Sequence, residues 1–510
     1  MNNSKSQLKS GVVLSYINLI IGNVIPLIYT PMMLSLLGQS EYGLYTLANT
    51  IVGYLSLLSF GMGSAIVRYI TKYKVSGDKE KERQMFGLFT FLFTVLAVIV
   101  FVLGIILSFN VHLFYSNTLN ASELQTMRIL IILCTINSAV TFLFTTYLSM
   151  IMIYERYVFR QILNIFTTVA MPCVNIIVLY MGLASVGMVV SSTVLNILVS
   201  VASVIYCHRS LHIKPKFKGM PFGELREIFG FCFFVFLGSV VDMLFWSTDK
   251  IIIGAVIGTV AVAVYNVGAT FNTIVTSIST TISSILTPKV TNMVFSSENT
   301  KVLTDFFIKV GRLQYLVVSL VVSGFIVFGR QFIHLWVGDG YNEAYFVALL
   351  TLLPVVVPLI QNTGLSIVMA QNKHKFRSIV YLIIAIVNVL TTAIAVNYWG
   401  IIGAAACSAA SYIIGQGFIM NWYYWKKTGI DIPMFWKNII KMSLAPVIMI
   451  TAGIIICHYV ELESWILLLM GIAIYLICYI PIVWFTGMNK YEKNIIITPV
   501  KNVFNRIRRK

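Results

Sequence analysis

Charged residues are scarce in this sequence. Only 11% of its 510 residues are Asp, Glu, Lys or Arg, whereas 58% are hydrophobic. A soluble globular domain carries about 25% charged residues, and a disordered chain has few apolar ones, so both classes are excluded. The composition indicates a membrane protein, and the first question is how many times the chain crosses the bilayer.

Cysteine and histidine are sparse and ungrouped. The seven cysteines lie singly in or beside apolar runs, at Cys134, Cys173, Cys207, Cys232, Cys407, Cys457 and Cys478. None forms a pair with redox or zinc spacing, and the six histidines form no cluster. We therefore expect no disulfide framework, no metal site and no cofactor. No motif identifies a coupling ion.

Long apolar runs dominate the chain. A helix needs about 20 mainly apolar residues to cross a hydrocarbon core of about 30 Å. Fourteen such runs occur, at residues 11–36, 42–68, 86–109, 126–151, 158–180, 184–207, 229–256, 261–287, 304–328, 344–370, 376–397, 400–423, 436–458 and 464–486. The first run is too long for a signal peptide and is interpreted as a retained helix. The predicted fold is all-α, a polytopic membrane protein with about 14 transmembrane helices.

The formal charge of +18 would suit nucleic-acid binding, but the positions of the basic residues indicate topology instead. With a cytoplasmic N-terminus, all but three of the 36 Lys and Arg residues fall in inner loops or in the two tails. The exceptions are Arg128, Lys250 and Arg330. This is the distribution that the positive-inside rule requires, so we expect both termini in the cytoplasm and no nucleic-acid partner.

The sequence contains signs of an internal duplication. LSMIMIYERYVFR at 148–160 aligns with LSIVMAQNKHKFR at 365–377, a shift of 217 residues. A weaker alignment, shifted by 220 residues, pairs Gly38 with Gly258 and Tyr45 with Tyr265. Nearly equal shifts favour a single duplication event.

The duplication predicts how the chain is divided. The predicted parts are an N-lobe of helices 1 to 6 at 1–210, a cytoplasmic linker at 211–228, a C-lobe of helices 7 to 12 at 229–428, and helices 13 and 14 with a basic cytoplasmic tail at 429–510. Since six is an even number, both lobes enter the bilayer from the same side. The two lobes are therefore parallel, and we expect a cleft between them.

Ionisable residues inside the bilayer gather in helix 7. Asp242 and Asp249 are seven residues apart, so a continuous helix would place them on one face, with Trp246 between them. Lys250 follows, about 100° around the helix. One hypothesis is that these residues line a substrate cavity, since charges in the bilayer usually face water or a partner. The alternative is that neighbouring helices satisfy them and that they only orient the lobes.

Three further residues are candidates for the same cavity. Arg68, at the inner end of helix 2, is either a positive-inside anchor or the cytoplasmic lip of the path. Gln361 and Asn362 in helix 10 either line the cavity or bond helix to helix. Pro354 and Pro358 precede them and suit an element that bends.

Three segments carry a family resemblance: residues 36–70, STDKIIIG at 247–254 with the following VYNVGATF, and YWGIIGAAACSAAS at 398–411. They resemble the polysaccharide-export, or oligosaccharide flippase, family, which includes the O-antigen and capsule repeat-unit flippases. This family belongs to the multidrug/oligosaccharidyl-lipid/polysaccharide exporter superfamily. The resemblance covers roughly residues 10–425.

The resemblance implies a two-lobe, MATE-like transporter in the bacterial cytoplasmic membrane. Such a protein moves an undecaprenyl-pyrophosphate-linked oligosaccharide from the inner to the outer leaflet by alternating access. Its implied partners are the lipid-linked glycan, membrane lipids and other membrane proteins of polysaccharide assembly. In this sequence Lys250 is the only basic residue well inside the bilayer, so a strongly cationic cavity is not evident.

Three alternatives remain at this point. A cation-coupled drug or organic-cation antiporter of the same superfamily would be expected to have twelve helices and an acidic coupling site. Here two helices are extra, and helices 1 to 6 hold no clearly intramembrane acid. A structural membrane protein is disfavoured by the ionisable residues in the bilayer. An enzyme is disfavoured because no nucleophile, base and acid occur together.

The predicted topology can be tested at the two copies of the repeat. Reporter fusions at residues 150 and 367 should both report a cytoplasmic position, because an even number of spans separates them. Alkaline phosphatase and fluorescent-protein fusions measure this directly. Opposite locations for the two fusions would contradict the parallel arrangement of the repeats.

Overall fold

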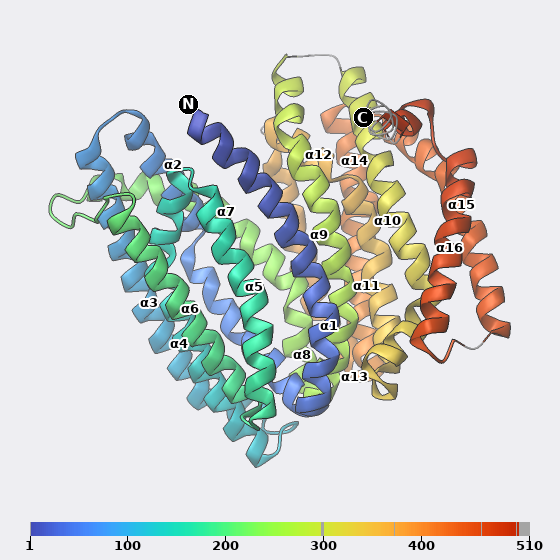
Figure 1. Cartoon of the computed structure of the whole chain (residues 1–510), viewed down its shortest axis with the longest axis horizontal. Helices are drawn as coiled ribbons and strands as arrows, with labels where there is room; N and C mark the ends of the chain where they lie inside the picture. Colours follow the sequence, from blue (N-terminus) through green and yellow to red (C-terminus); the bar gives the residue numbers. More distant parts are fainter. Residues whose placement is uncertain (1, 297–299, 372, 461, 496, 499–510) are drawn as a thin grey trace, which may run out of the picture. The chain divides into compact units, whose positions relative to one another are not determined.

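The computed structural model shows a helical chain without strands among the residues that it describes (Figure 1). The described residues are 2–296, 300–371, 373–460, 462–495 and 497–498. The chain divides into two compact units, Met1–Ala263 and Val264–Lys510. They are called unit 1 and unit 2 below, and each is described by itself.

Unit 1 contains long helices joined by short turns. The α-helices are α1 (Asn2–Tyr54), α2 (Met62–Val75), α3 (Lys79–Tyr115), α4 (Ala121–Ile153), α5 (Tyr157–Tyr180), α6 (Ala184–Arg209), α7 (Leu225–Trp246) and α8 (Thr248–Val256). Short 3-10 helices occur at η1 (Leu55–Ser59) and η2 (Phe222–Glu224). Within this unit α3 and α6 both pack against α4, and α1 lies along α5 (Figure 1).

Unit 2 continues from α9 (Thr259–Ser296), which begins just before the division. Its further α-helices are α10 (Thr300–Val337), α11 (Asn342–Ile360), α12 (Asn362–Ala370), α13 (His374–Tyr412), α14 (Asn421–Tyr423), α15 (Ile432–Tyr459) and α16 (Trp465–Thr486). The other helical segments are η3 (Asp339–Tyr341, 3-10), η4 (Ile413–Met420, π) and η5 (Tyr424–Thr428, π). Within the unit α10 packs against α11 and α15, and α15 pairs with α16.

The helices have the length and composition of membrane spans. The described residues include 12 helical stretches that are long and apolar enough to cross a bilayer. Two of these stretches, Val13–Val75 and Lys375–Thr428, continue through a glycine with non-helical backbone angles, Gly38 (φ 76°) and Gly400 (φ 57°). Both glycines lie near boundaries between predicted spans, so dividing the stretches there gives the fourteen spans expected from the sequence. The prediction of an all-α, polytopic membrane fold is confirmed.

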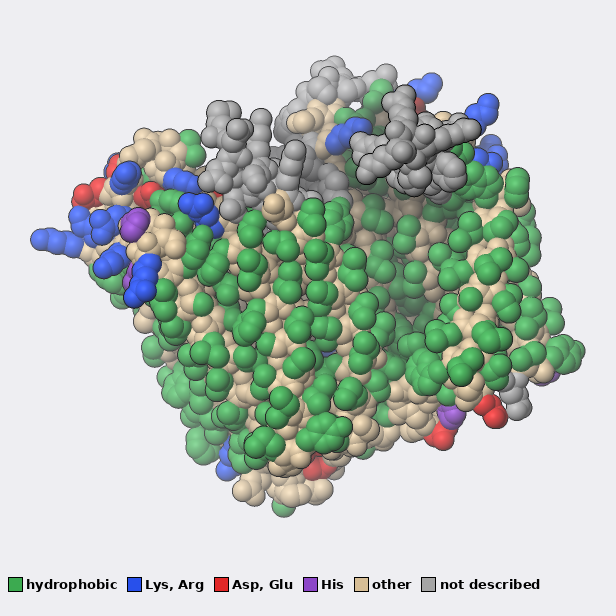
Figure 2. Space-filling model, viewed as in Figure 1, with side chains coloured by type: hydrophobic (Ala, Val, Ile, Leu, Met, Phe, Trp, Pro, Cys, Tyr) green, Lys and Arg blue, Asp and Glu red, His purple; other side chains and the backbone are tan. Residues whose placement is uncertain are grey.

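The surface has the distribution expected of a membrane protein. Hydrophobic side chains cover the middle of unit 1 and the length of α15 and α16 in unit 2 (Figure 2). In unit 1, Lys and Arg side chains gather on this face where the α2–α3 turn and the segment after α6 lie (Figures 1 and 2). An apolar belt with a basic rim is what a bilayer and its anionic headgroups require.

Both repeat alignments have structural counterparts. Gly38 and Gly258 each adopt a positive φ, 76° and 122°. In unit 1 the rings of Phe159 and Tyr206 stack with centroids 3.8 Å apart and planes 9° apart. In unit 2 the rings of Phe376 and Tyr423 stack at 4.4 Å and 10°. Both members of the second pair lie 217 residues after those of the first, the same shift as in the alignment.

The predicted lobe and linker boundaries stay a prediction. The contacts group α7 and α8, which the sequence analysis assigned to the second lobe, with unit 1. The segment after α6 follows the first turns of α3, where the Lys216 amide donates to the Arg83 carbonyl at 2.9 Å. The Lys216 ammonium also pairs with Glu80 at 2.6 Å. This part of the predicted linker is therefore held against α3.

A buried ion pair ties the end of the chain to α10 in unit 2. Arg312 Nε lies 2.6 Å from Glu492 Oε1, and Arg312 Nη2 donates to Glu492 Oε2 at 2.9 Å and to the Gly487 carbonyl at 2.8 Å. Both residues are almost inaccessible, with 6% and 2% exposure. Glu492 Oε2 also accepts the Asn489 amide at 2.8 Å. Both carboxylate oxygens of Glu492 and two of the three nitrogens of the Arg312 guanidinium are therefore hydrogen bonded, which helps to offset the cost of burying the charges.

Removing one partner of this pair should be strongly destabilising. Glu492→Gln should lower the free energy of unfolding by about 3–5 kcal/mol, because it leaves the Arg312 charge buried without its counter-charge. The double variant Arg312→Met/Glu492→Met should lose less stability than either Arg312→Met or Glu492→Met alone, because it leaves no unpaired charge. Thermal unfolding of the purified protein in detergent measures this.

The exposed pair of Lys216 and Glu80 is the matched control. Its side chains are 36% and 64% exposed, so Glu80→Gln should change stability by less than about 1 kcal/mol. Equal shifts for Glu492→Gln and Glu80→Gln would show that the buried pair has no special role.

Candidate functional site

The predicted helix 7 is interrupted. α7 ends at Trp246, Ser247 has non-helical angles (φ −122°, ψ −26°), and α8 begins at Thr248. The expectation that Asp242 and Asp249 share one face of a continuous helix is therefore wrong. The break changes the direction of the side chains that follow it, so the seven-residue spacing no longer implies a common face.

Tyr54, at the C-terminal end of α1, bonds to this break. Its hydroxyl donates to the Met243 carbonyl at 3.1 Å and shares a second hydrogen bond with the Thr248 hydroxyl. Met243 precedes the break and Thr248 follows it. A single side chain from another helix therefore joins both sides of the interruption.

A second break lies against α7. Between α1 and α2, Phe60 (φ 47°) and Gly61 (φ 68°) both have left-handed angles. The Phe60 ring packs on Phe236 of α7 with centroids 4.7 Å apart. A Cβ on Gly61 would lie 2.5 Å from Cγ1 of Val235, so this position requires glycine both for its backbone angle and for its space.

The two breaks indicate a functional site, because lipid cannot hydrogen bond to the amide and carbonyl groups of irregular backbone. At membrane depth such backbone is tolerated only where protein buries it or where it lines a wet cavity. Transporters commonly form substrate and ion sites at discontinuous helices. The segment from Tyr54 to Gly61 and the segment from Asp242 to Lys250 are therefore the candidate functional site, called the paired-break site below.

The ionisable residues of this site have different environments. Asp249 is buried, with 2% exposure, and lies in the first turn of α8, where the helix dipole favours a negative charge. Lys250, the next residue, is partly buried and interacts electrostatically with it. Asp242 is exposed, and Trp246 is 41% exposed. The structure thus separates a buried acid beside the break from an accessible acid and indole on α7.

Arg68 lies on α2, which packs against α7, seven residues after Gly61. Its side chain is exposed, and its guanidinium lies 4.7 Å from the ring centroid of Phe231 on α7. The neighbouring Tyr69 hydroxyl donates to Glu227 of α7 at 3.1 Å. Arg68 therefore belongs to the contact between α2 and α7 in unit 1, and its proposed place at the lip of a path stays a prediction.

Gln361 and Asn362 lie in unit 2, at the turn between α11 and α12. Gln361 is 1% exposed, and its amide donates to Asn421 Oδ1 at 2.8 Å. The indole of Trp436 donates to the same oxygen at 3.0 Å. Gln361 therefore connects helices within unit 2, while Nδ2 of Asn362 is buried without a hydrogen-bond partner. Their shared cavity with Lys250 stays a prediction.

Neither the role of Tyr54 nor the break at Ser247 was predicted from the sequence. The adjacent Ser247 and Thr248 are a weak sign of the break, since two small polar residues interrupt an apolar run. Tyr54 gives no sign, because tyrosine is common in membrane helices and its partners lie 189 and 194 residues away. Among the described residues, no group of three His, Cys, Asp or Glu side chains is placed to hold a metal ion.

The family model described as a polysaccharide biosynthesis protein matches residues 32–346, more than half of the chain and all of the paired-break site. The chain belongs to this family. Among curated proteins, none matches the sequence.

Solved structures place the chain among known folds. The lipid II flippase MurJ, in an inward closed conformation, matches with a TM-score of 0.71 and 15% identity, over 92% of this chain and 97% of that one. A mutant of the Vibrio cholerae MATE transporter VcmN matches with a TM-score of 0.57 and 14% identity, over 85% of this chain and 99% of that one. The inward-facing conformation of a multidrug resistance MATE family transporter of the MOP superfamily matches with a TM-score of 0.58 and 15% identity, over 82% of this chain and 99% of that one. At these identities the likeness shows the fold alone, which this chain shares with the three structures.

The role of Tyr54 at the break can be tested by removing one oxygen. Tyr54→Phe should lower the free energy of unfolding by about 1 kcal/mol, because the Met243 carbonyl and the Thr248 hydroxyl each lose a partner. Thermal unfolding in detergent measures the change. Tyr16→Phe, at a 42% exposed position on α1, is the control and should have no effect. A Tyr54→Phe protein as stable as wild type would remove Tyr54 from the support of the break.

Proposed function

We propose that this protein is a flippase that moves an undecaprenyl-pyrophosphate-linked oligosaccharide repeat unit from the inner to the outer leaflet of the bacterial cytoplasmic membrane by alternating access. Both termini face the cytoplasm in this proposal. The observation that carries it is membership of the polysaccharide biosynthesis family, whose model includes the paired-break site.

The physical properties of the chain support a substrate with a polar head and a lipid tail. The head group of such a lipid carries a pyrophosphate and sugars, and it needs polar groups in the bilayer to replace water during transfer. The paired-break site offers a cation at Lys250 beside irregular backbone, and Asp242 and Trp246 lie on the preceding helix. The polyprenyl tail needs no such groups, because it can stay in the lipid.

A cation-coupled antiporter for drugs or organic cations is the second candidate. Asp249 supports it, because a buried acid on a broken helix is a suitable place for a coupling cation. The family match favours the flippase, since it points to polysaccharide synthesis rather than to drug export. In the flippase, Asp249 would couple a cation to the movement of the glycan lipid.

Deletion of the gene should separate these two functions. The lipid-linked glycans of the mutant should accumulate on the cytoplasmic face, because their transfer is blocked. Extraction of the lipid-linked fraction, with and without an impermeant glycan-modifying reagent applied to intact cells, measures this. An unchanged glycan pool together with greater sensitivity to cationic dyes would instead support the antiporter.

The role of the paired-break site in transport can be tested in the complemented mutant. Lys250→Ala and Asp242→Asn should abolish transport without lowering the amount of protein in the membrane, because each removes a charge that meets the substrate. Lys250→Arg keeps the charge and should retain part of the activity, and Arg128→Ala is a control outside the site. Wild-type transport by both Lys250→Ala and Asp242→Asn would show that residues 242–250 do not bind the substrate.

A further inference from the structure

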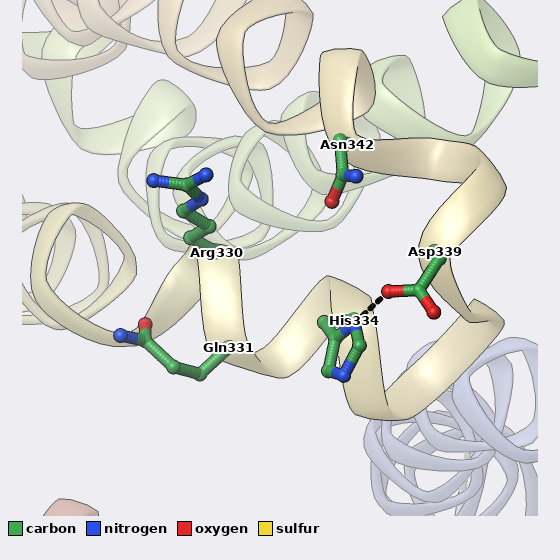
Figure 3. A pocket seen from close by; sticks show the side chains of 5 residues that line it. All are labelled: Arg330, Gln331, His334, Asp339 and Asn342. Carbon is green, nitrogen blue, oxygen red and sulfur yellow. Dashed lines mark ion pairs between the residues drawn. The ribbon is translucent and has the colours of Figure 1, made fainter. Parts of the chain in front are cut away.

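Unit 2 contains a cavity that is lined by polar residues, none of which belongs to the paired-break site. Its volume is about 380 Å³, and it is lined by Arg330, Gln331, His334, Asp339 and Asn342. These residues come from the end of α10, from η3 and from the first turn of α11 (Figure 3). Pockets that bind small ligands begin at about 300 Å³, so the cavity has room for a small ligand.

The cavity is built on a rigid support. α10 ends at Val337, and Gly338 (φ 90°) turns the chain back while its amide donates to the His334 carbonyl at 2.9 Å. Ile333 and Trp336, on the other face of α10, are buried, with 1% and 5% exposure. The Trp336 ring packs on Phe271 with centroids 5.5 Å apart. The polar side chains therefore project from a helix end that the core of unit 2 holds in place.

The polar groups of the cavity are only partly used by the protein. His334 Nδ1 lies 2.7 Å from Asp339 Oδ1, drawn as a dashed line in Figure 3, but the side chains are 50% and 86% exposed. Such an exposed pair contributes little stability, and the second carboxylate oxygen stays accessible. Oε1 of Gln331 is buried without a hydrogen-bond partner. The Asn342 amide points toward the ion pair in Figure 3.

The chemistry of this set selects among ligand classes. Arg330 offers only donors, Asp339 only acceptors, and the amides of Gln331 and Asn342 offer both. A phosphate would meet the Asp339 carboxylate, and a cation would meet the Arg330 guanidinium, so each would face a like charge. A neutral polyhydroxyl compound has hydroxyl groups that both donate and accept, and it matches the whole set. That chemistry describes a sugar.

The length of α10 and the charge distribution of the sequence bear on which side of the membrane the cavity faces. α10 has 38 residues, and at about 1.5 Å per residue it is roughly 57 Å long, far more than the ~30 Å hydrocarbon core. The helix is therefore too long for both of its ends to lie inside the apolar layer if it crosses the bilayer upright. The distribution of Lys and Arg along the sequence predicts that the 329–343 loop faces the outside.

We propose that this cavity is a carbohydrate-binding subsite that holds a neutral sugar unit of the glycan at the outer face of the membrane. This rests on the proposed flippase function, which supplies a glycan on that side. Arg330 and Asp339 orient the sugar hydroxyls, and Gln331 and Asn342 complete the set of hydrogen bonds. By binding a sugar of the head group after its delivery, the subsite lowers the free energy of the glycan lipid at the outer face and so opposes its return to the inner face.

The test uses the full-length protein in lipid nanodiscs prepared without alkyl-glycoside detergents, whose sugar heads would compete. The probes are maltose, cellobiose, lactose and chitobiose, followed by saturation-transfer-difference NMR. At least one disaccharide should bind saturably, and Gln331→Ala and Asp339→Asn should each weaken that binding about tenfold or more, because each removes hydrogen bonds to the sugar. Glu343→Gln, an exposed neighbour outside the cavity lining, is the matched control and should bind as wild type does.

Several outcomes would overturn the subsite. They are no binding of any disaccharide to the wild type, equal binding by wild type and both variants, and binding of inorganic pyrophosphate that Arg330→Ala abolishes. The last would make the cavity an anion site. Thermal unfolding of each variant shows that it is folded.

Failure of this inference is distinguishable from failure of the proposed function. Glycan accumulation in the deletion mutant without disaccharide binding would reject the subsite alone. Disaccharide binding that depends on Gln331 and Asp339, with no glycan accumulation, would keep the site and reject the flippase.

Discussion

The absence of water from the bilayer is the constraint on which this structure depends. Because lipid cannot hydrogen bond to amide and carbonyl groups, the chain must satisfy them within helices, and any interruption needs a partner inside the protein. Unit 1 meets this need at Ser247 with the Tyr54 hydroxyl, which bonds to the backbone on one side of the interruption and to Thr248 on the other. The break at Ser247 is therefore a place where groups of the protein itself satisfy the interrupted backbone.

Much of the fold follows from the sequence because the apolar length of a span is a local property. The runs around Gly38 and Gly400 were separable in the sequence because polar or small residues lie between them, and the structure has its positive φ angles at these glycines. The same local reasoning failed within the predicted helix 7. There Ser247 and Thr248 interrupt the apolar run only briefly, and Tyr54, which bonds to the break, is distant in the sequence. In a continuous helix, the seven-residue spacing would put Asp242 and Asp249 on a common face, and the break removes that continuity.

The candidate site was predictable in its residue types and not in its geometry. Charges in the bilayer are conspicuous in a sequence with so few of them, which is why Asp249 and Lys250 were found. Whether such a charge is buried or accessible depends on helices far away in the chain, and the sequence does not encode this locally. The duplication was detectable for the opposite reason. The alignment contains Phe159 and Phe376, and each of these rings stacks on a tyrosine 47 residues further along, Tyr206 and Tyr423, so the repeat in the sequence has the same packing in both halves.

The ion pair of Arg312 and Glu492 has a consequence for how the protein is made. Its partners are 180 residues apart, and a ribosome adds about 5–20 residues per second, so Arg312 is synthesised roughly 9–36 s before its counter-charge exists. During that interval α10 carries a guanidinium with no carboxylate to neutralise it. The N-terminal part of α10 must then stay hydrated, and it can pack in its final place only after Glu492 has been synthesised. The final packing of α10 in unit 2 thus waits for the synthesis of Glu492.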